Sequence, residues 1–288
     1  MLQRQKILLG LLLCSEVSLS KLKLVKLAFL LKNETIIQKD NTFYDFIPYK
    51  YGPFSFTLYH ELDELRNQGF ISTDKLQVNM KSMNLSKMQF NTLSKEQRYC
   101  ISKVLNKYGK LTDSRLIQIV YSNYPWFAIR SELNHHVNDV KIDGELKIYT
   151  AGYEENSIDF FFQKLLKFGI RRLVDVRRNP ISRKKGFSKG KLSEYCNKMG
   201  IEYIHFRELG VPSDLRVSLN SFEDYQKVLK LYDEEILPQK KYVIDKVTKI
   251  INKEPTVIVC FEKDHNCCHR SRLAKVLSEK TSLEIQHI

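Results

Sequence analysis

The sequence of 288 residues has no long hydrophobic run, few cysteines and too few acidic residues to balance its basic ones. No apolar stretch approaches the ~20 residues that a membrane helix needs. The apolar segment 7–14 lacks a small-x-small cleavage site and is soon followed by Glu16 and Lys21, which favours a core helix over a signal peptide. Six cysteines, three of them within residues 260–268, do not make a disulfide scaffold. We therefore expect a cytoplasmic protein with reduced thiols.

The charge of the chain is strongly one-sided. Lys and Arg number 47 against 33 Asp and Glu, which gives a formal net charge of +14, and both halves of the chain are basic. A balance of this kind indicates a polyanionic partner, either nucleic acid or an anionic membrane surface. The absence of an amphipathic anchor or lipidation signal favours nucleic acid. Hydrophobic residues make up 43% of the chain, which excludes disorder and allows two domains.

The first part of the chain has the pattern of a winged helix-turn-helix domain. Apolar periodicity predicts helices over 4–14, 19–32 and 54–67 and extended segments over 43–49, 70–72 and 77–85. In the second helix, lysines stand between the apolar positions. The order predicts an α+β DNA-binding domain over 1–90, although a helical protein-interaction module has the same order. Residues 91–146, with helices over 94–107 and 112–121, are interpreted as a helical connector and linker.

One segment of this first part resembles a known family. Tyr51-Gly52-Pro53 stands before a predicted helix, and residues 23–30 upstream lie in another predicted helix. Residues 20–75 resemble in this way the SocA/Panacea antitoxin-like family. The aromatic residues around Gly52 are more typical of a core than of a base-stacking platform. His135 and His136 lack the accompanying Cys or carboxylate residues of a metal site.

From residue 147 onward, strands alternate with helices. Strands are predicted over 147–150, 171–176, 203–206, 256–261 and 282–288, with helices over 157–168, 192–200, 222–237, 238–253 and 268–279. This alternation predicts a Rossmann-like, mostly parallel α/β domain over 147–288. Ligands of such sheets bind at the carboxyl ends of the strands. The polar residues that follow each strand are therefore the first candidates for a site.

The residues at the strand ends form recognisable motifs. They are Gly152-Tyr153-Glu154, then Asp175-Val176-Arg177-Arg178-Asn179-Pro180-Ile181-Ser182, then Tyr203 with Glu208-Leu209-Gly210, and finally Cys260-Phe261-Glu262 with Cys268-His269-Arg270-Ser271-Arg272-Leu273-Ala274. Several motifs in order make residues 147–280 resemble the DUF488 family. The resemblance implies the fold, and it carries no reaction with it. Fusions of this domain to a winged-helix-like front half look similar to the whole chain.

Two carboxylates in these motifs suggest hydrolytic chemistry. Asp175 and Glu262 end two strands that could be neighbours, and either could activate water against an N-glycosidic bond. His269, Arg270 or Tyr203 could assist the leaving base. A flipped base would need a concave pocket at this edge. A purely structural reading, with ion pairs Asp175–Arg177 and Glu262–Arg270, stays open.

A basic loop follows the second of these strands. Residues 171–191 hold nine basic residues and one acid, and the loop contains Gly186 and Gly190. The predicted nucleic-acid or anion-binding residues are Arg177, Arg178, Arg183, Lys184, Lys185, Lys189, Arg270 and Cys268. Phe187 could wedge between bases or anchor the loop. The predicted partner is double-stranded DNA with an altered base, and the predicted function is a DNA glycosylase-like hydrolase of repair or anti-phage defence.

Three alternatives accompany this hypothesis. A rhodanese-like or phosphatase-like thiol enzyme needs an Arg six residues after Cys260, but that position is Asn266. A metal site could draw on Cys260, Cys267, Cys268, His265 and His269. No C-x2-C pair exists, so we expect no metal and no cofactor. A non-enzymatic regulator would bind an operator and sense a small anionic ligand in the C-terminal pocket.

Overall fold

The computed structural model describes residues 1–72, 76–133, 142–216 and 221–288. The chain separates into two compact units, Met1–Lys141 and Ile142–Ile288, here called the N-terminal and the C-terminal unit. Within these described ranges, no helix is both long enough and apolar enough to cross a membrane. The histidine pair at 135–136 and most of the predicted linker lie outside the described residues.

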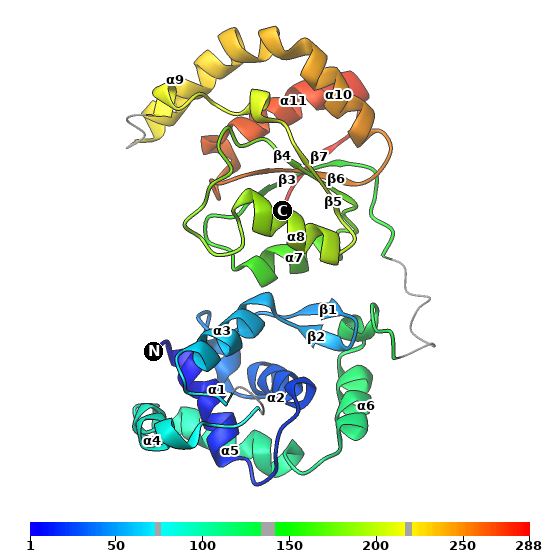
Figure 1. Ribbon diagram of the computed structural model, residues 1–288. Helices are drawn as coiled ribbons and strands as arrows, with labels where there is room; N and C mark the ends of the chain where they lie inside the picture. Colours follow the sequence, from blue (N-terminus) through cyan, green and yellow to red (C-terminus); the bar gives the residue numbers. More distant parts are fainter. Residues whose placement is uncertain (73–75, 134–141, 217–220) are drawn as a thin grey trace. The chain divides into compact units, whose positions relative to one another are not determined.

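The N-terminal unit is mostly helical (Figure 1). Its α-helices are α1 (Gln3–Cys14), α2 (Lys21–Glu34), α3 (Phe56–Asn67), α4 (Met83–Asn91), α5 (Lys95–Tyr108) and α6 (Asp113–Asn123). Short 3-10 helices η1 (Ile36–Lys39), η2 (Met80–Ser82) and η3 (Pro125–Ala128) join them, and β1 (Ile47–Tyr49) pairs with β2 (Gly52–Phe54) as an antiparallel hairpin. Hydroxyl caps begin several helices. Ser20, Ser94 and Thr112 each accept a hydrogen bond from a backbone N–H of the first turn.

A single hydrophobic core runs through this unit and moves the predicted domain boundary. Ile101 of α5 and Leu116 of α6 are fully buried in the same cluster as Leu8 of α1 and Leu27 of α2. Residues 95–123 therefore belong to the core of the N-terminal unit and do not form a connector after a domain that ends at residue 90. Local periodicity found the helices correctly, but it carries no information on which helices share a core.

The predicted wing is also corrected. The segment 77–85 pairs with 70–72 only through the isolated bridge Ile71–Val78, and the chain becomes helical again at Met80.

Two lysines of α2 point inward: Lys23 Nζ donates to the Leu111 carbonyl at 2.7 Å, and Lys26 Nζ donates to the Tyr51 carbonyl. Burial of Lys26 lowers its pKa to about 7.

The β1–β2 turn explains the glycine of the Tyr51-Gly52-Pro53 segment. Gly52 has a φ of +86°, a conformation that side chains rarely adopt. A Cβ at this position would lie 2.6 Å from Tyr121 Cε1 and 3.1 Å from Lys26 Nζ. The close approach therefore serves core packing between the hairpin, α2 and α6.

The C-terminal unit contains a five-stranded parallel sheet, as predicted. Its strands are β3 (Ile148–Gly152), β4 (Arg172–Asp175), β5 (Glu202–His205), β6 (Thr256–Cys260) and β7 (Ile285–His287). The strand order is β5-β4-β6-β3-β7, so β6 lies between β3 and β4. Strands β3 and β6 are buried along their whole length, which accounts for their apolar sequences.

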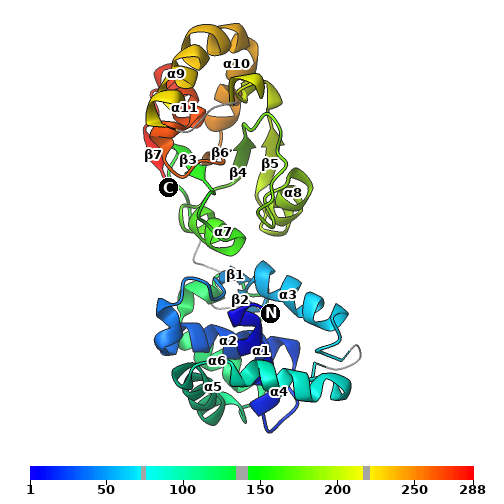
Figure 2. The same ribbon diagram turned by 90° about the vertical axis from the view of Figure 1, so that its left-hand side faces the viewer.

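Helices cover both faces of this sheet (Figures 1 and 2). One face packs against α7 (Ile158–Lys167) and α8 (Lys189–Lys198), and the other against α10 (Lys241–Ile251) and α11 (His269–Thr281). The predicted long helices over 222–253 are α9 (Phe222–Leu231), a π-helical turn (Tyr232–Ile236), a 3-10 turn (Leu237–Lys240) and α10. Because all five strands are parallel, Gly152, Asp175, His205 and Cys260 end at one edge, here called the carboxyl edge.

Candidate functional site at the carboxyl edge

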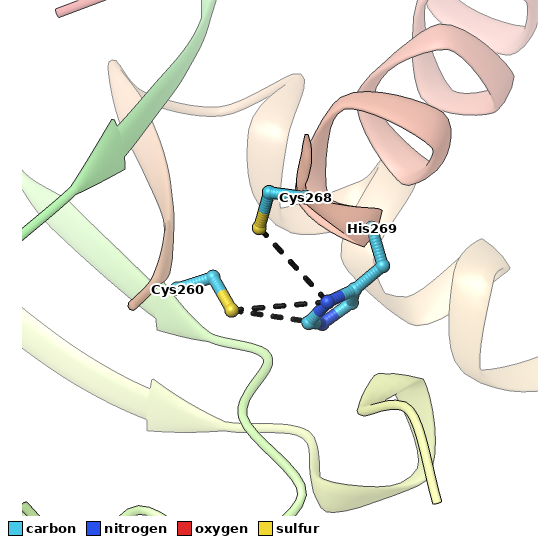
Figure 3. A group of neighbouring side chains, drawn as sticks. All are labelled: Cys260, Cys268 and His269. Atoms are coloured by element: carbon cyan, nitrogen blue, oxygen red, sulfur yellow. Dashed lines mark hydrogen bonds between the residues drawn. The ribbon is translucent and has the colours of Figure 1, made fainter. Parts of the chain in front are cut away.

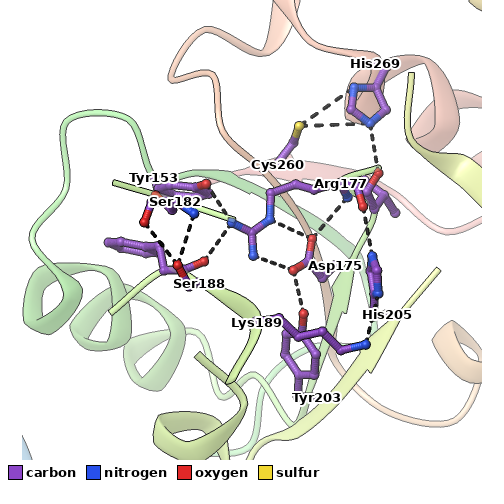
Figure 4. Close-up of polar contacts among 12 residues, drawn as sticks. Tyr153, Asp175, Arg177, Ser182, Ser188, Lys189, Tyr203, His205, Cys260 and His269 are labelled. Carbon is purple, nitrogen blue, oxygen red and sulfur yellow. Dashed lines mark hydrogen bonds and ion pairs between the residues drawn. The ribbon is translucent and has the colours of Figure 1, made fainter. Parts of the chain in front are cut away.

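The end of β4 holds a buried ion pair (Figure 4). Asp175 is fully buried and Arg177 is 4% exposed. Arg177 Nε donates to Asp175 Oδ1 at 2.8 Å and Nη2 donates to Oδ2 at 2.5 Å, while the Arg177 backbone N–H donates to Oδ1 at 3.1 Å. Burial opposes the guanidinium charge, but the hydrogen bonds and charge of Asp175 raise the net pKa of Arg177.

Two tyrosines complete this cluster. Tyr203 Oη donates to Asp175 Oδ2 at 2.6 Å, and Arg177 Nη1 donates to Tyr153 Oη at 2.6 Å. Burial, followed by the charge and hydrogen bond of Asp175, raises the pKa of Tyr203. The predicted roles are thereby corrected: the Asp175 carboxylate already accepts four hydrogen bonds, and the Tyr203 proton is committed to it.

The same arginine anchors the basic loop. Arg177 Nη1 also donates to the Phe187 carbonyl at 2.8 Å. The Phe187 ring is fully buried and stacks on Tyr153, with ring centroids 4.2 Å apart and an interplanar angle of 7°. Phe187 is therefore the loop anchor and does not project as a wedge. Arg177 points inward as well, which removes it from the predicted set of nucleic-acid contacts.

A second cluster lies at the end of β6. Cys260 Sγ and Cys268 Sγ lie 3.1 and 3.0 Å from the same oxygen, Glu262 Oε2, and both thiols donate to it. Burial opposes ionisation of Glu262, but the nearby His269 and the two thiol hydrogen bonds lower the net pKa of its carboxyl. Burial raises the pKa of the Cys268 thiol. Cys260, the nucleophile of the thiol-enzyme alternative, is fully buried, which disfavours that alternative.

The helix α11 places the next two residues inside this cluster. His269, 2% exposed, has Nε2 3.2 Å from the Val176 carbonyl and Nδ1 3.7 Å from Cys260 Sγ. Arg270, also 2% exposed, donates to the Glu262 and Lys263 carbonyls. The structure therefore corrects the anion-binding roles of Cys268 and Arg270. Both are buried, and Arg270 holds the 262–263 backbone without pairing with the Glu262 carboxylate.

Several cations of the loop do reach the surface. Arg183, Lys185 and Lys189 are exposed, and Arg178 is half-buried. Within the described part of the chain, Arg178 and Arg183 have no hydrogen-bond or ion-pair partner. Lys184 Nζ donates to the Glu154 carbonyl, and the Glu154 carboxylate accepts from the Lys263 backbone N–H at 2.9 Å.

The contacts of Glu154 with Lys184 and with the Lys263 backbone join the loop to Glu262, which directly precedes Lys263. Of the two residues with predicted catalytic carboxylates, Asp175 is fully buried, whereas Glu262 is half-buried. Sequence reasoning missed Tyr153 and Glu154 as organising residues. Their place directly after the first strand was the signal, but a tyrosine and a glutamate at a strand end do not reveal which way they point.

The fold and the two clusters define a mixed α/β protein with a parallel sheet in its C-terminal half and a mostly helical N-terminal half. Residues 157–277 match the family model of DUF488, a domain of unknown function. Residues 24–127 match the model of the SocA-like antitoxin, Panacea domain. The predicted fusion is thus confirmed, and the second match extends through α5 and α6, as the core does. No curated protein and no solved structure matches the chain.

Proposed function

We propose that the protein binds DNA and hydrolyses the N-glycosidic bond of an altered base at the carboxyl edge. The observation that carries the proposal is the position of Glu262. Glu262 is a half-buried residue at the edge where parallel sheets bind their ligands. Contacts of Lys263, Glu154 and Lys184 join it to the loop that carries the exposed cations.

The loop supplies the electrostatic part of the proposal. Arg178 and Arg183 have no partner among the described residues, and Lys185 and Lys189 are exposed. Guanidinium and ammonium groups of this kind contact phosphates without reading sequence. A backbone held here would bring a flipped base toward Glu262.

The chemistry then needs one water molecule. Glu262 would accept a proton from the water while the water oxygen attacks C1′ of the sugar and the C1′–N bond breaks. The protonated Glu262 would then give that proton to the departing base. The products are the free base and an abasic site. Asp175 has no part in this step, because its oxygens are occupied by Arg177 and Tyr203.

A role in defence is part of the proposal. The family model that matches residues 24–127 is named for an antitoxin. Antitoxin-like regions joined to a second domain fit a protein that acts on foreign nucleic acid. The N-terminal unit would then hold duplex DNA or a partner while the C-terminal unit acts on a base.

The test is an abasic-site assay. Duplexes with and without modified bases are incubated with the protein and treated with alkali, which cleaves the strand at abasic sites. We expect cleavage of a modified duplex, and a loss of about 10²–10⁴-fold in Glu262→Gln. Glu279→Gln, at an exposed position of α11, is the matched control and should retain activity. Tight binding to one sequence without cleavage of any duplex would support the regulator instead.

A further inference from the structure

We propose that Cys260, Cys268 and His269 bind a zinc ion (Figure 3). The three side chains converge from the end of β6 and the start of α11, and their ligand atoms all lie within 4.8 Å of one another. All three are buried, with at most 2% of each residue exposed. Two sulfurs and one imidazole nitrogen are donors that zinc prefers over magnesium or calcium.

The distances fit a single tetrahedral ion. His269 Nδ1 lies 3.7 Å from Cys260 Sγ and 4.0 Å from Cys268 Sγ. Zinc bonds of about 2.3 Å to sulfur and 2.0 Å to nitrogen place such donors roughly 3.6 Å apart at tetrahedral angles. Both nitrogen–sulfur distances lie within a few tenths of an ångström of this value, and the two sulfurs lie within 4.8 Å of each other.

The second nitrogen of His269 supports this assignment. His269 Nε2 lies 3.2 Å from the Val176 carbonyl, which accepts only from a protonated nitrogen. That contact places the proton on Nε2 and leaves the lone pair of Nδ1, which lies 3.7 Å from Cys260 Sγ and 4.0 Å from Cys268 Sγ, available to a metal. Zinc-bound histidines are commonly oriented by such a hydrogen bond from their other nitrogen to a carbonyl.

The backbone around the cluster is firmly held. Arg270 donates to the Glu262 and Lys263 carbonyls, which fixes the chain just after Cys260. Gly152 of β3 allows this chain to approach, because a Cβ there would lie 1.8 Å from the Glu262 carbonyl oxygen. The site is therefore preorganised by residues that are not themselves ligands.

The structure also narrows the candidate ligands that the sequence offered. Cys267 Sγ lies 3.8 Å from Asp264 Oδ2, and the His265 ring stacks on His287 with centroids 3.7 Å apart. Neither belongs to the convergent group. Of the adjacent cysteines Cys267 and Cys268, only Cys268 therefore belongs to the proposed zinc site.

Binding is balanced by the loss of two protons. Two Zn–S bonds and one Zn–N bond form, and the thiol protons that now point to Glu262 Oε2 leave for solvent. Three protein ligands would leave a fourth position of a bound zinc ion open to water. That water would give a proton to the Glu262 carboxylate and so supply hydroxide for hydrolysis. This last consequence rests on the proposed function, whereas the zinc site itself does not.

The test measures metal content without DNA. The full chain is purified under a thiol-free reductant, supplied with zinc and passed through gel filtration, and zinc per chain is determined by elemental analysis. We expect one zinc per chain in the wild type and a loss in Cys260→Ser, Cys268→Ser and His269→Ala. The matched controls Cys267→Ser and Cys196→Ser should retain it.

A second measurement keeps the proposal falsifiable if a variant fails to fold. Cobalt(II) added to the reduced wild type should give the near-ultraviolet charge-transfer band of thiolate ligands. Reduced wild type that binds neither metal, or equal zinc content in Cys260→Ser and Cys267→Ser, overturns the proposal. Zinc binding without release of any base would support the zinc site and would contradict only the proposed hydrolase function.

Discussion

Arg177 closes on Asp175, two residues before it, through two parallel hydrogen bonds of 2.8 and 2.5 Å. Both residues stand at the strand end where a ligand is expected, yet they bind each other. Arg177 also holds Tyr153 and the Phe187 carbonyl. The pair therefore fixes the base of the loop that carries the exposed cations, and its contribution is to stability.

Asp175→Asn should destabilise the C-terminal unit by about 3–5 kcal/mol, because it leaves the Arg177 charge buried without a counter-ion. Urea unfolding followed by circular dichroism measures the change. Asp245→Asn breaks an exposed ion pair, Lys280 Nζ to Asp245 Oδ1 at 2.9 Å, and should cost at most about 1 kcal/mol. Equal stability of Asp175→Asn and wild type would contradict the buried pairing.

Gly152→Ala should destabilise the C-terminal unit by about 1–3 kcal/mol, because the new methyl group would meet the Glu262 carbonyl oxygen at 1.8 Å. The matched control is Gly190→Ala in the first turn of α8, where nothing lies within 4 Å of a Cβ. That change should be neutral or stabilising by up to about 1 kcal/mol. Thermal unfolding of both variants measures the two effects. Similar unfolding midpoints of Gly152→Ala and Gly190→Ala would contradict the close approach of Gly152 to the Glu262 carbonyl.

Neutralising Arg183, Lys185 and Lys189 with glutamine should weaken DNA binding and flatten its dependence on salt. Each lost phosphate contact reduces the slope of log K against log salt by about 0.9. A matched triple change on α10 and just beyond it uses Lys246, Lys249 and Lys253, which are also exposed. Binding isotherms at several salt concentrations separate the two sets. Equal slopes in both triple variants would place the interface elsewhere.

Lys26 should make the N-terminal unit more stable as pH rises. Its pKa is about 7 in the folded chain and 10.5 when solvated, so between these values the unfolded chain binds a proton that the folded chain lacks. Stability therefore increases with pH across this window, by up to about 1.4 kcal/mol per pH unit. Lys26→Met should flatten the profile.

Fluorescence of Trp126 measures this profile, because the chain has one tryptophan and it lies in the N-terminal unit. Lys103→Met, at an exposed position of α5, is the control and should keep the wild-type slope. A Lys26→Met profile that still rises between pH 7 and 10 would show that another group titrates there.

The sequence predicted most elements, because their signals are local. Apolar strand segments that alternate with amphipathic helix segments predicted all five strands of the parallel sheet, with bounds within a few residues of those in the structure. The boundary at residue 90 failed for a different reason. Whether α5 packs on α1 depends on contacts such as that of Gly10 with Ile101, where a Cβ would lie 2.8 Å from Ile101 Cδ1. Periodicity carries no such information.

The sequence predicted where the candidate site residues lie, and their roles stay predictions. Asp175, Glu262 and His269 lie near the carboxyl edge, as expected, since parallel strands gather their ends at one edge. The sequence could not show that Asp175 faces Arg177 while Glu262 faces two thiols. A side chain's partner depends on rotamer and neighbouring strands, and β6 reaches its place between β3 and β4 from about 80 residues further along the chain.

The central position of β6 has a consequence for synthesis of the chain. Until residues 256–260 have left the ribosome, β3 has no neighbour to pair with on the β4 side, and β4 can pair only with β5. The sheet of the C-terminal unit therefore cannot assemble completely until about a hundred residues of this unit have emerged from the ribosome. A chain that ends at residue 255 should show protease cleavage throughout residues 142–255 and protection of the N-terminal unit.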